Sequence, residues 1–91
     1  MPENRQFSIA VHVMATLGYN NGPVTSGTIA QSVNTSPSFV RRVLAKLSKA
    51  RLVETTTGKT GAASLARPAD KISLLEIYRA VEAPRAFSIH D

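Results

Sequence analysis

Hydrophobic positions in the first half of the chain recur with the period of a helix, in three separate runs. Apolar side chains cover one face of residues 5–18, and Ile9 and Val13 widen this face to more than half of the girth. Two shorter runs, over 26–33 and 37–50, keep their apolar residues on one side at the i, i+3, i+4 spacing of a buried helical face. The pattern predicts three helices, the first of which can pack against both the core and a partner chain.

The connection between the second and third predicted helices has the sequence of a tight turn. Ser26 is expected to cap the start of the second helix, and Asn34 to end it, because Asn tolerates the left-handed conformation that terminates helices. Ser36 offers a hydroxyl to the free N–H groups of the third helix, and Pro37 suits its first position. Together these signals predict a helix-turn-helix, a motif that points to DNA.

Beyond the third helix the period changes from helix to strand. β-branched residues dominate 52–57, and 63–66 can return as a second strand after a loop that contains glycine. Ser73 and Glu76 have the spacing of a capping box, which predicts a fourth helix over 74–82. A two-stranded hairpin directly after the third helix is the wing of a winged helix. The predicted fold class is therefore mostly α, a winged helix-turn-helix with a two-stranded β-hairpin wing.

The basic residues are concentrated in one part of the chain. Residues 36–60 contain six Lys and Arg against Glu54 alone, whereas the remainder holds five basic and five acidic residues, so the whole formal excess of +5 lies in this segment. A surface that binds phosphates needs such concentration, because affinity comes from displacing the counterions of the duplex. A charge run by itself is more often a solvated helix face. Inside a helix-turn-helix it favours DNA binding.

Helical geometry assigns these basic residues to different roles. A rotation of 100° per residue turns Arg42 and Lys49 away from the apolar side of the third helix, with Arg41 and Lys46 on the flanks. The first turns of a recognition helix usually read base edges, and arginine can grip guanine through two hydrogen bonds. Later lysines and the backbone N–H groups at helix starts are expected to contact phosphates. The predicted DNA-binding residues are Ser26, Ser36, Ser38, Phe39, Arg41, Arg42, Lys46, Lys49 and Lys59.

A few single residues are candidates for packing, metal-binding or catalytic roles. Phe39 lies at the edge of the buried face, so packing is favoured over contact with a thymine methyl group. His12 is expected to be packed or to lie in a dimer interface rather than to bind a metal. Ser88, His90 and Asp91 are too close in sequence for the geometry of a catalytic triad, and His90 beside Asp91 is an incidental metal pair. We therefore predict no catalytic residue, no metal site and no enzymatic activity.

Length and composition bound the remaining possibilities. Ninety-one residues make one small domain, and 43% hydrophobic content argues for a folded chain. The absence of Cys excludes disulfides and thiolate metal sites, so no cofactor is expected within these residues. No apolar run approaches the roughly twenty residues of a membrane span, and no signal pattern opens the chain. The expected location is cytoplasmic, without a membrane partner.

Several short motifs together keep the order and spacing of one family. They include residues 36–40, the Ala-Arg-Leu-Val of 50–53, the Leu-Ala-Arg-Pro of 65–68 and the run over 72–82. Over nearly its whole length the chain resembles the bacterial winged-helix regulators that include IscR, NsrR and CymR. The resemblance implies a homodimeric transcription factor, acting as a repressor on double-stranded DNA. Its two recognition helices would enter successive major grooves of a palindromic operator.

The chain departs from this family at the wing and at its end. Family wings commonly carry an arginine followed by glycines and an aromatic residue, whereas Lys59 is the only cation at this wing tip. Family members also continue into a long dimerisation helix, preceded in some by cysteines that bind an iron–sulfur cluster or sense thiols. We expect residues 1–83 to form the winged helix-turn-helix DNA-binding domain. Residues 84–91 would begin a C-terminal dimerisation or sensing segment that is cut short, and with the first helix would form the dimer interface.

Two classes of function remain open from the sequence. The first is a sequence-specific DNA-binding regulator. The second is a winged helix that acts as a protein-interaction module and binds an acidic partner through its basic face. The basic recognition helix favours the first, and the salt dependence of binding to specific and random duplexes would separate the two.

Overall fold

Four helices and a small sheet make up the fold in a computed structural model, which describes residues 2–20, 22–56 and 61–82. The predictions of four helices and a hairpin are confirmed, and the first helix is longer at both ends than the 5–18 expected. The elements in chain order are α1 (Pro2–Asn20), β1 (Val24–Thr25), α2 (Ser26–Val33), α3 (Pro37–Lys49), β2 (Val53–Thr55), β3 (Ala62–Leu65), the 3-10 helix η1 (Ala69–Lys71) and α4 (Leu74–Val81).

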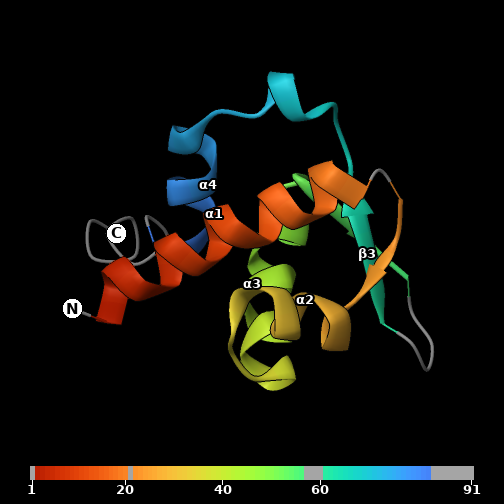
Figure 1. The fold of residues 1–91 in the computed structure, drawn as a ribbon. Helices are drawn as coiled ribbons and strands as arrows, with labels where there is room; N and C mark the ends of the chain where they lie inside the picture. The colour runs from red at the N-terminus through yellow and green to blue at the C-terminus, as the bar shows by residue number, and fades with distance from the viewer. Residues whose placement is uncertain (1, 21, 57–60, 83–91) are drawn as a thin grey trace.

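The long helix α1 organises the molecule. It runs diagonally across the centre, with α2 and α3 below it, the sheet at one end and α4 above (Figure 1), and it contacts α2, α3, α4 and β3. Ala10, Val13 and Leu17 are fully or almost fully buried. These several contacts explain why the helix is apolar over so much of its girth. His12 is exposed, so the prediction that it packs within the chain is wrong, and its place in a dimer interface stays a prediction.

The sheet has three antiparallel strands in the order β1-β3-β2. The predicted hairpin is confirmed as β2 and β3, with Val53 opposite Leu65. The additional strand β1 pairs with the other side of β3, placing Val24 opposite Ala63. Two residues are too few to show an alternating pattern, which is why sequence periodicity did not reveal β1. This strand ties the start of α2 to the wing.

The turn between α2 and α3 is built as its sequence indicates. Asn34 takes the left-handed conformation, with φ 59° and ψ 54°, and the N–H of Thr35 donates to the Ala30 carbonyl at 2.9 Å. Ser36 Oγ accepts from the N–H of Phe39 at 3.2 Å and so caps α3, and Pro37 opens that helix. The predicted helix-turn-helix is therefore confirmed with both of its turn signals.

The cap of α2 is one residue earlier than predicted. Thr25 Oγ1, not the Ser26 hydroxyl, accepts from the N–H of Thr28, at 3.2 Å. Ser26 is the first helical residue and is only 3% exposed. The prediction of a Ser26 cap is wrong because β1 holds Thr25 in an extended conformation, and an N-cap needs that backbone shape.

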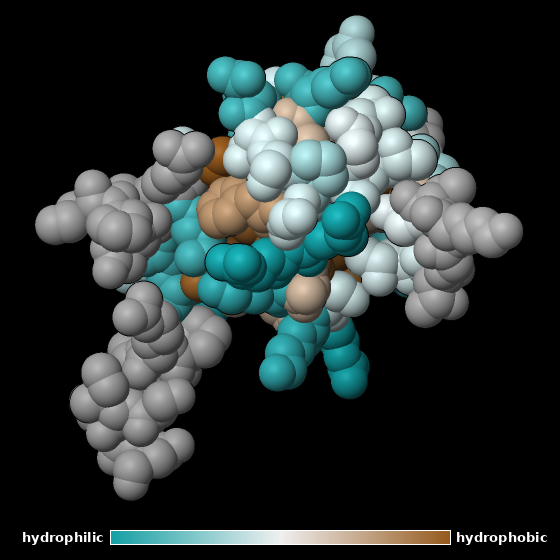
Figure 2. Space-filling model, turned by 90° about the horizontal axis from the view of Figure 1, so that it is seen from below, coloured by the Kyte–Doolittle hydropathy of each residue, from teal (hydrophilic) through white to brown (hydrophobic). Residues whose placement is uncertain are grey.

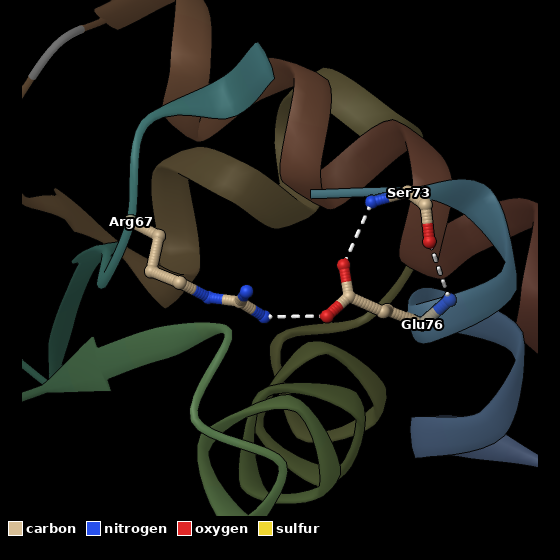
Figure 3. Close-up of polar contacts among 3 residues, drawn as sticks. All are labelled: Arg67, Ser73 and Glu76. Carbon is tan, nitrogen blue, oxygen red and sulfur yellow. Dashed lines mark hydrogen bonds and ion pairs between the residues drawn. The ribbon is translucent and has the colours of Figure 1, made fainter. Parts of the chain in front are cut away.

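The predicted capping box at the start of α4 is confirmed. Ser73 Oγ accepts from the Glu76 N–H at 3.1 Å, and Glu76 Oε1 accepts from the Ser73 N–H at 2.9 Å (Figure 3). Arg67, which follows β3, adds an ion pair to the same carboxylate. The Ser73 N–H, and after it the Arg67 guanidinium, stabilise the charged form and lower the pKa of Glu76 below its ordinary value.

Candidate nucleic-acid interface

One side of α3 is buried and the opposite side is open to solvent. Val40, Val43, Leu44 and Leu47 are each at most 3% exposed and pack into the core. The side chains that point the other way are all exposed, and we call them the α3 outer face: Ser38, Arg41, Arg42, Ala45 and Lys49. The outward direction inferred from the sequence thus holds for Ser38, Arg42, Ala45 and Lys49. Arg41, which was predicted on the flank, is exposed as well, so two arginines and one lysine lie on or beside this surface.

The outer face is basic and carries no compensating acid. The sequence has no Asp or Glu between Glu3 and Glu54, a stretch that includes all of α2 and α3. In the part of the chain that the structure describes, the one ion pair is between Arg67 and Glu76, away from α3. The cations of the outer face are therefore available to phosphate oxygens.

Hydrophilic side chains also gather around α3 on the same side of the molecule. Figure 2 views the molecule from below, where α2 and α3 lie, and shows hydrophilic and pale, intermediate surface around a smaller hydrophobic patch. An open hollow between α2 and the start of α3 is lined by Thr25, Thr28, Gln31, Thr35 and Pro37, among others. Hydroxyl and amide groups of this kind donate hydrogen bonds to phosphates.

The polar residues of α2 were missed by sequence reasoning. Thr28 and Gln31 are exposed, on the side of α2 opposite the buried Ile29 and Val33. The same helical rotation that identified the outer face of α3 could have found them, because their buried neighbours have the spacing of one face. The candidate interface therefore spans both helices of the motif.

Phe39 and Lys46 do not join the outer face. Phe39 is half-buried and packs against the core, in agreement with the packing role favoured from the sequence. The Lys46 ammonium points back into the molecule, where it donates to the side chain of Gln6 and to the carbonyl of Val81 at 3.5 Å. These contacts are with residues far away in sequence, and the phosphate contact predicted for Lys46 stays a prediction.

The remaining predicted residues lie at the edge of the described surface or outside it. Ser36 is exposed at the start of α3, with its hydroxyl used as the cap. The Ser26 side chain is buried, so a DNA contact at the start of α2 would have to come from the backbone or from the side chains of Thr25 and Thr28. Lys59 and residues 84–91 lie outside the described residues.

Comparison with known proteins identifies the family. The model of the Rrf2 family, described as an iron-dependent transcriptional regulator, matches residues 4–91. The chain belongs to this family. It is 38% identical over 89 residues to YwnA of Bacillus subtilis, whose name gives it as an HTH-type transcriptional regulator. This match covers 97% of the chain but 65% of YwnA, so the chain spans less than two thirds of that relative.

Solved structures of the same family share the fold. The chain superposes on T. potens IscR with a TM-score of 0.75 at 30% identity, covering 85% of this chain and 58% of IscR. CymR, the global cysteine regulator of B. subtilis, gives a TM-score of 0.78 at 27% identity, covering 87% of this chain and 63% of CymR. The winged-helix prediction is thereby confirmed. The matching family is described as transcriptional regulators, and the chain shares the DNA-binding fold of these relatives.

The family description names iron, and the residues that the structure describes do not offer the ligands of an iron site. The 91 residues contain no Cys and two His. His12 is exposed on α1, and in the described part of the chain no three His, Asp or Glu side chains come together as metal ligands. None of the helices in the described ranges is long and apolar enough to cross a membrane.

Proposed function

We propose that this Rrf2 chain binds a specific DNA operator through the outer face of α3 and represses transcription as a homodimer. The observation that carries this proposal is the exposure of Arg41, Arg42 and Lys49 on the second helix of a helix-turn-helix without an acidic neighbour on either helix. Arginines in the first turns can form bidentate hydrogen bonds with guanine in the major groove. The lysine farther along is suited to phosphate contact.

The surface formed by α1 and α4 supports a homodimer. Leu74, Leu75 and Tyr78 on α4 are 62%, 56% and 44% exposed, which is high for large hydrophobic side chains. The Tyr78 ring packs edge-to-face on Phe7 of α1 at a centroid distance of 5.7 Å, so this apolar surface continues onto α1. A patch of this kind marks an interaction site. A second copy of the chain, whose own segment from residue 84 would also contribute, is the proposed partner.

The test begins with selection of duplexes from a random library by the full chain. We expect the selected sequence to have two inverted half-sites about one helical turn apart, because two recognition helices related by a two-fold axis read such a palindrome. Fluorescence anisotropy titrations on the selected and scrambled duplexes at several salt concentrations then measure specificity. Equal affinity for both duplexes would contradict sequence-specific binding.

Further measurements address the dimer, the direction of regulation and the alternative partner. Two chains per operator duplex are expected in sedimentation, and a reporter behind the operator should be less active when the protein is present. Tight binding to an acidic polypeptide without any preference among duplexes would instead favour the protein-interaction module. A chelator should leave operator affinity unchanged, because no cofactor is proposed within these residues. As a regulator of bacterial genes the protein is proposed to act in the cytoplasm.

A further inference from the structure

Lys46 differs from the other cations of α3 in what it contacts. It is half-buried, and its ammonium donates to the side chain of Gln6 on α1 and to the carbonyl of Val81, the last residue of α4. These partners are 40 and 35 residues away in sequence. One side chain in the middle of the recognition helix therefore joins three helices.

The acceptor at Val81 explains why a lysine suits this position. The last carbonyls of a helix have no partner within it, and together they carry a partial negative charge. An ammonium on a flexible four-carbon stem can reach such a group from a neighbouring helix and satisfy it. Gln6 supplies a second oxygen, so Lys46 has an acceptor on each of the two helices that flank α3.

We infer that Lys46 is a positioning residue, which sets the orientation of the recognition helix rather than contacting DNA. This inference rests on the proposed function, because it assigns the orientation a role in reading the operator. Lys46 lies four positions after Arg42 in α3. At 100° per residue, the two side chains leave the helix about 40° apart. Bonds that hold Lys46 toward α1 and α4 therefore act together with the buried apolar side of α3 to set the direction of the outer face. It also makes the position of α3 depend on the last turn of α4.

A positioning role and a phosphate contact predict different effects on DNA binding. Hydrogen bonds to bases require accurate placement of α3, whereas phosphate contacts tolerate small shifts. Lys46→Met removes the ammonium but keeps most of the apolar stem. It should weaken operator binding by about tenfold, the equivalent of one hydrogen bond to a charged group. Binding to random duplex, and the slope of log affinity against log salt, should stay close to those of the wild-type protein.

Lys49→Met is the matched control, because Lys49 is an exposed lysine of the same helix that belongs to the outer face. It should weaken operator and random duplex alike and lower the salt slope by about one unit. Lys46→Arg, which keeps a cationic donor, should recover most of the operator affinity lost in Lys46→Met. If Lys46→Met lowers the salt slope as Lys49→Met does, Lys46 is a phosphate contact and the inference is overturned.

Gln6→Leu tests the same bond from the side of α1. The thermal midpoint of the Gln6→Leu, Lys46→Met double variant should lie close to that of Lys46→Met alone, because both changes remove one shared interaction. If the two changes lower the thermal midpoint additively, Gln6 and Lys46 do not share a hydrogen bond and the inference is overturned. This measurement needs no DNA, so it still decides whether the bond exists if the wild-type protein binds no operator and the proposed function fails. If Lys46→Met does not fold, operator specificity of Gln6→Leu decides instead, and an unchanged specificity contradicts the inference.

Discussion

Arg67 Nη2 lies 2.9 Å from Glu76 Oε2, and the other oxygen of the same carboxylate accepts from the Ser73 N–H (Figure 3). One side chain thus closes the capping box of α4 and holds the segment that leaves β3. The wing and the last described helix are connected through Glu76. Both interactions favour the charged carboxylate, so its protonation is coupled to folding.

The first prediction concerns the loss of stability at acid pH. The pKa of Glu76 is lowered in the folded protein from its ordinary value of 4.5, so its contribution is fully present above pH 4.5 and is lost as the pH falls through the lowered pKa. Glu76→Gln should be less stable than the wild-type protein at pH 7, and the two unfolding midpoints should converge as the solution becomes more acidic. Thermal unfolding by circular dichroism from pH 7 to pH 3 measures this.

Arg67→Met provides the control for that experiment. It removes the ion pair and leaves the capping box intact, so its pH dependence should lie between those of the wild-type protein and Glu76→Gln. The backbone hydrogen bond from Ser73 is the larger cause of the lowered pKa. If Arg67→Met and Glu76→Gln show the same pH dependence of stability, the capping hydrogen bond makes no measurable contribution to the lowered pKa of Glu76.

The second prediction separates base contact from phosphate contact on the outer face. Arg42 is exposed in the first half of α3, where a guanidinium can reach a base edge. Arg42→Ala should cost about 1–3 kcal/mol on the operator and relax the preference at one base position. Titrations against operator variants that differ at single positions identify that position. An equal loss on operator and scrambled duplex would make Arg42 a phosphate contact instead.

The third prediction concerns the lysines. Lys49→Ala should weaken specific and random duplexes about equally and reduce the salt slope by about one unit, because an ammonium near phosphate acts as a point charge. Lys59→Ala at the wing is expected to behave in the same way. Titrations at several salt concentrations measure both slopes, with Arg42→Ala as the comparison. A change in base preference for either lysine variant would contradict this assignment.

The sequence predicted best those features whose causes are local. Asn34 and Ser36 act through hydrogen bonds to residues three or four positions away, so their roles could be inferred from the turn sequence alone. The sequence places the cap of α2 on the neighbouring Ser26, because the contact that decides it is the strand pairing of Thr25 with the distant Ala62. The inward contacts of Lys46 cannot be predicted from the sequence for the same reason, since Gln6 and Val81 become its neighbours only in the folded chain.

The fourth prediction concerns the cap of the recognition helix. Ser36→Ala removes the hydroxyl that accepts from the Phe39 N–H and should lower the free energy of unfolding by about 1 kcal/mol. Because the change loosens the first turn of α3, which contains Ser38 and leads into Arg41, operator affinity should fall as well. Thr25→Ala makes the equivalent change at α2 and should cost a similar amount of stability. Urea denaturation of both variants measures the cost, and an unchanged midpoint would show that water replaces the cap.

The last prediction concerns Arg51, which follows the C-cap residue Ala50 of α3 and adopts a left-handed backbone with φ 65°. Its N–H donates to the Ser48 carbonyl at 2.9 Å, and the next N–H, of Leu52, donates to Leu47 at 3.0 Å, so the turn needs this backbone shape. Side chains with a Cβ disfavour this region, and glycine does not. Arg51→Gly should therefore raise the free energy of unfolding by about 0.5–1.5 kcal/mol.

Two comparison variants test this explanation of the Arg51 effect. Arg51→Ala removes the guanidinium but keeps the Cβ, so its stability should remain close to that of the wild-type protein. Asn34→Gly should gain less than Arg51→Gly, because Asn already tolerates the left-handed region that it occupies at φ 59°. Urea denaturation of the three variants gives the comparison. If Arg51→Ala gains as much stability as Arg51→Gly, the gain comes from removal of the positive charge, and the backbone argument fails.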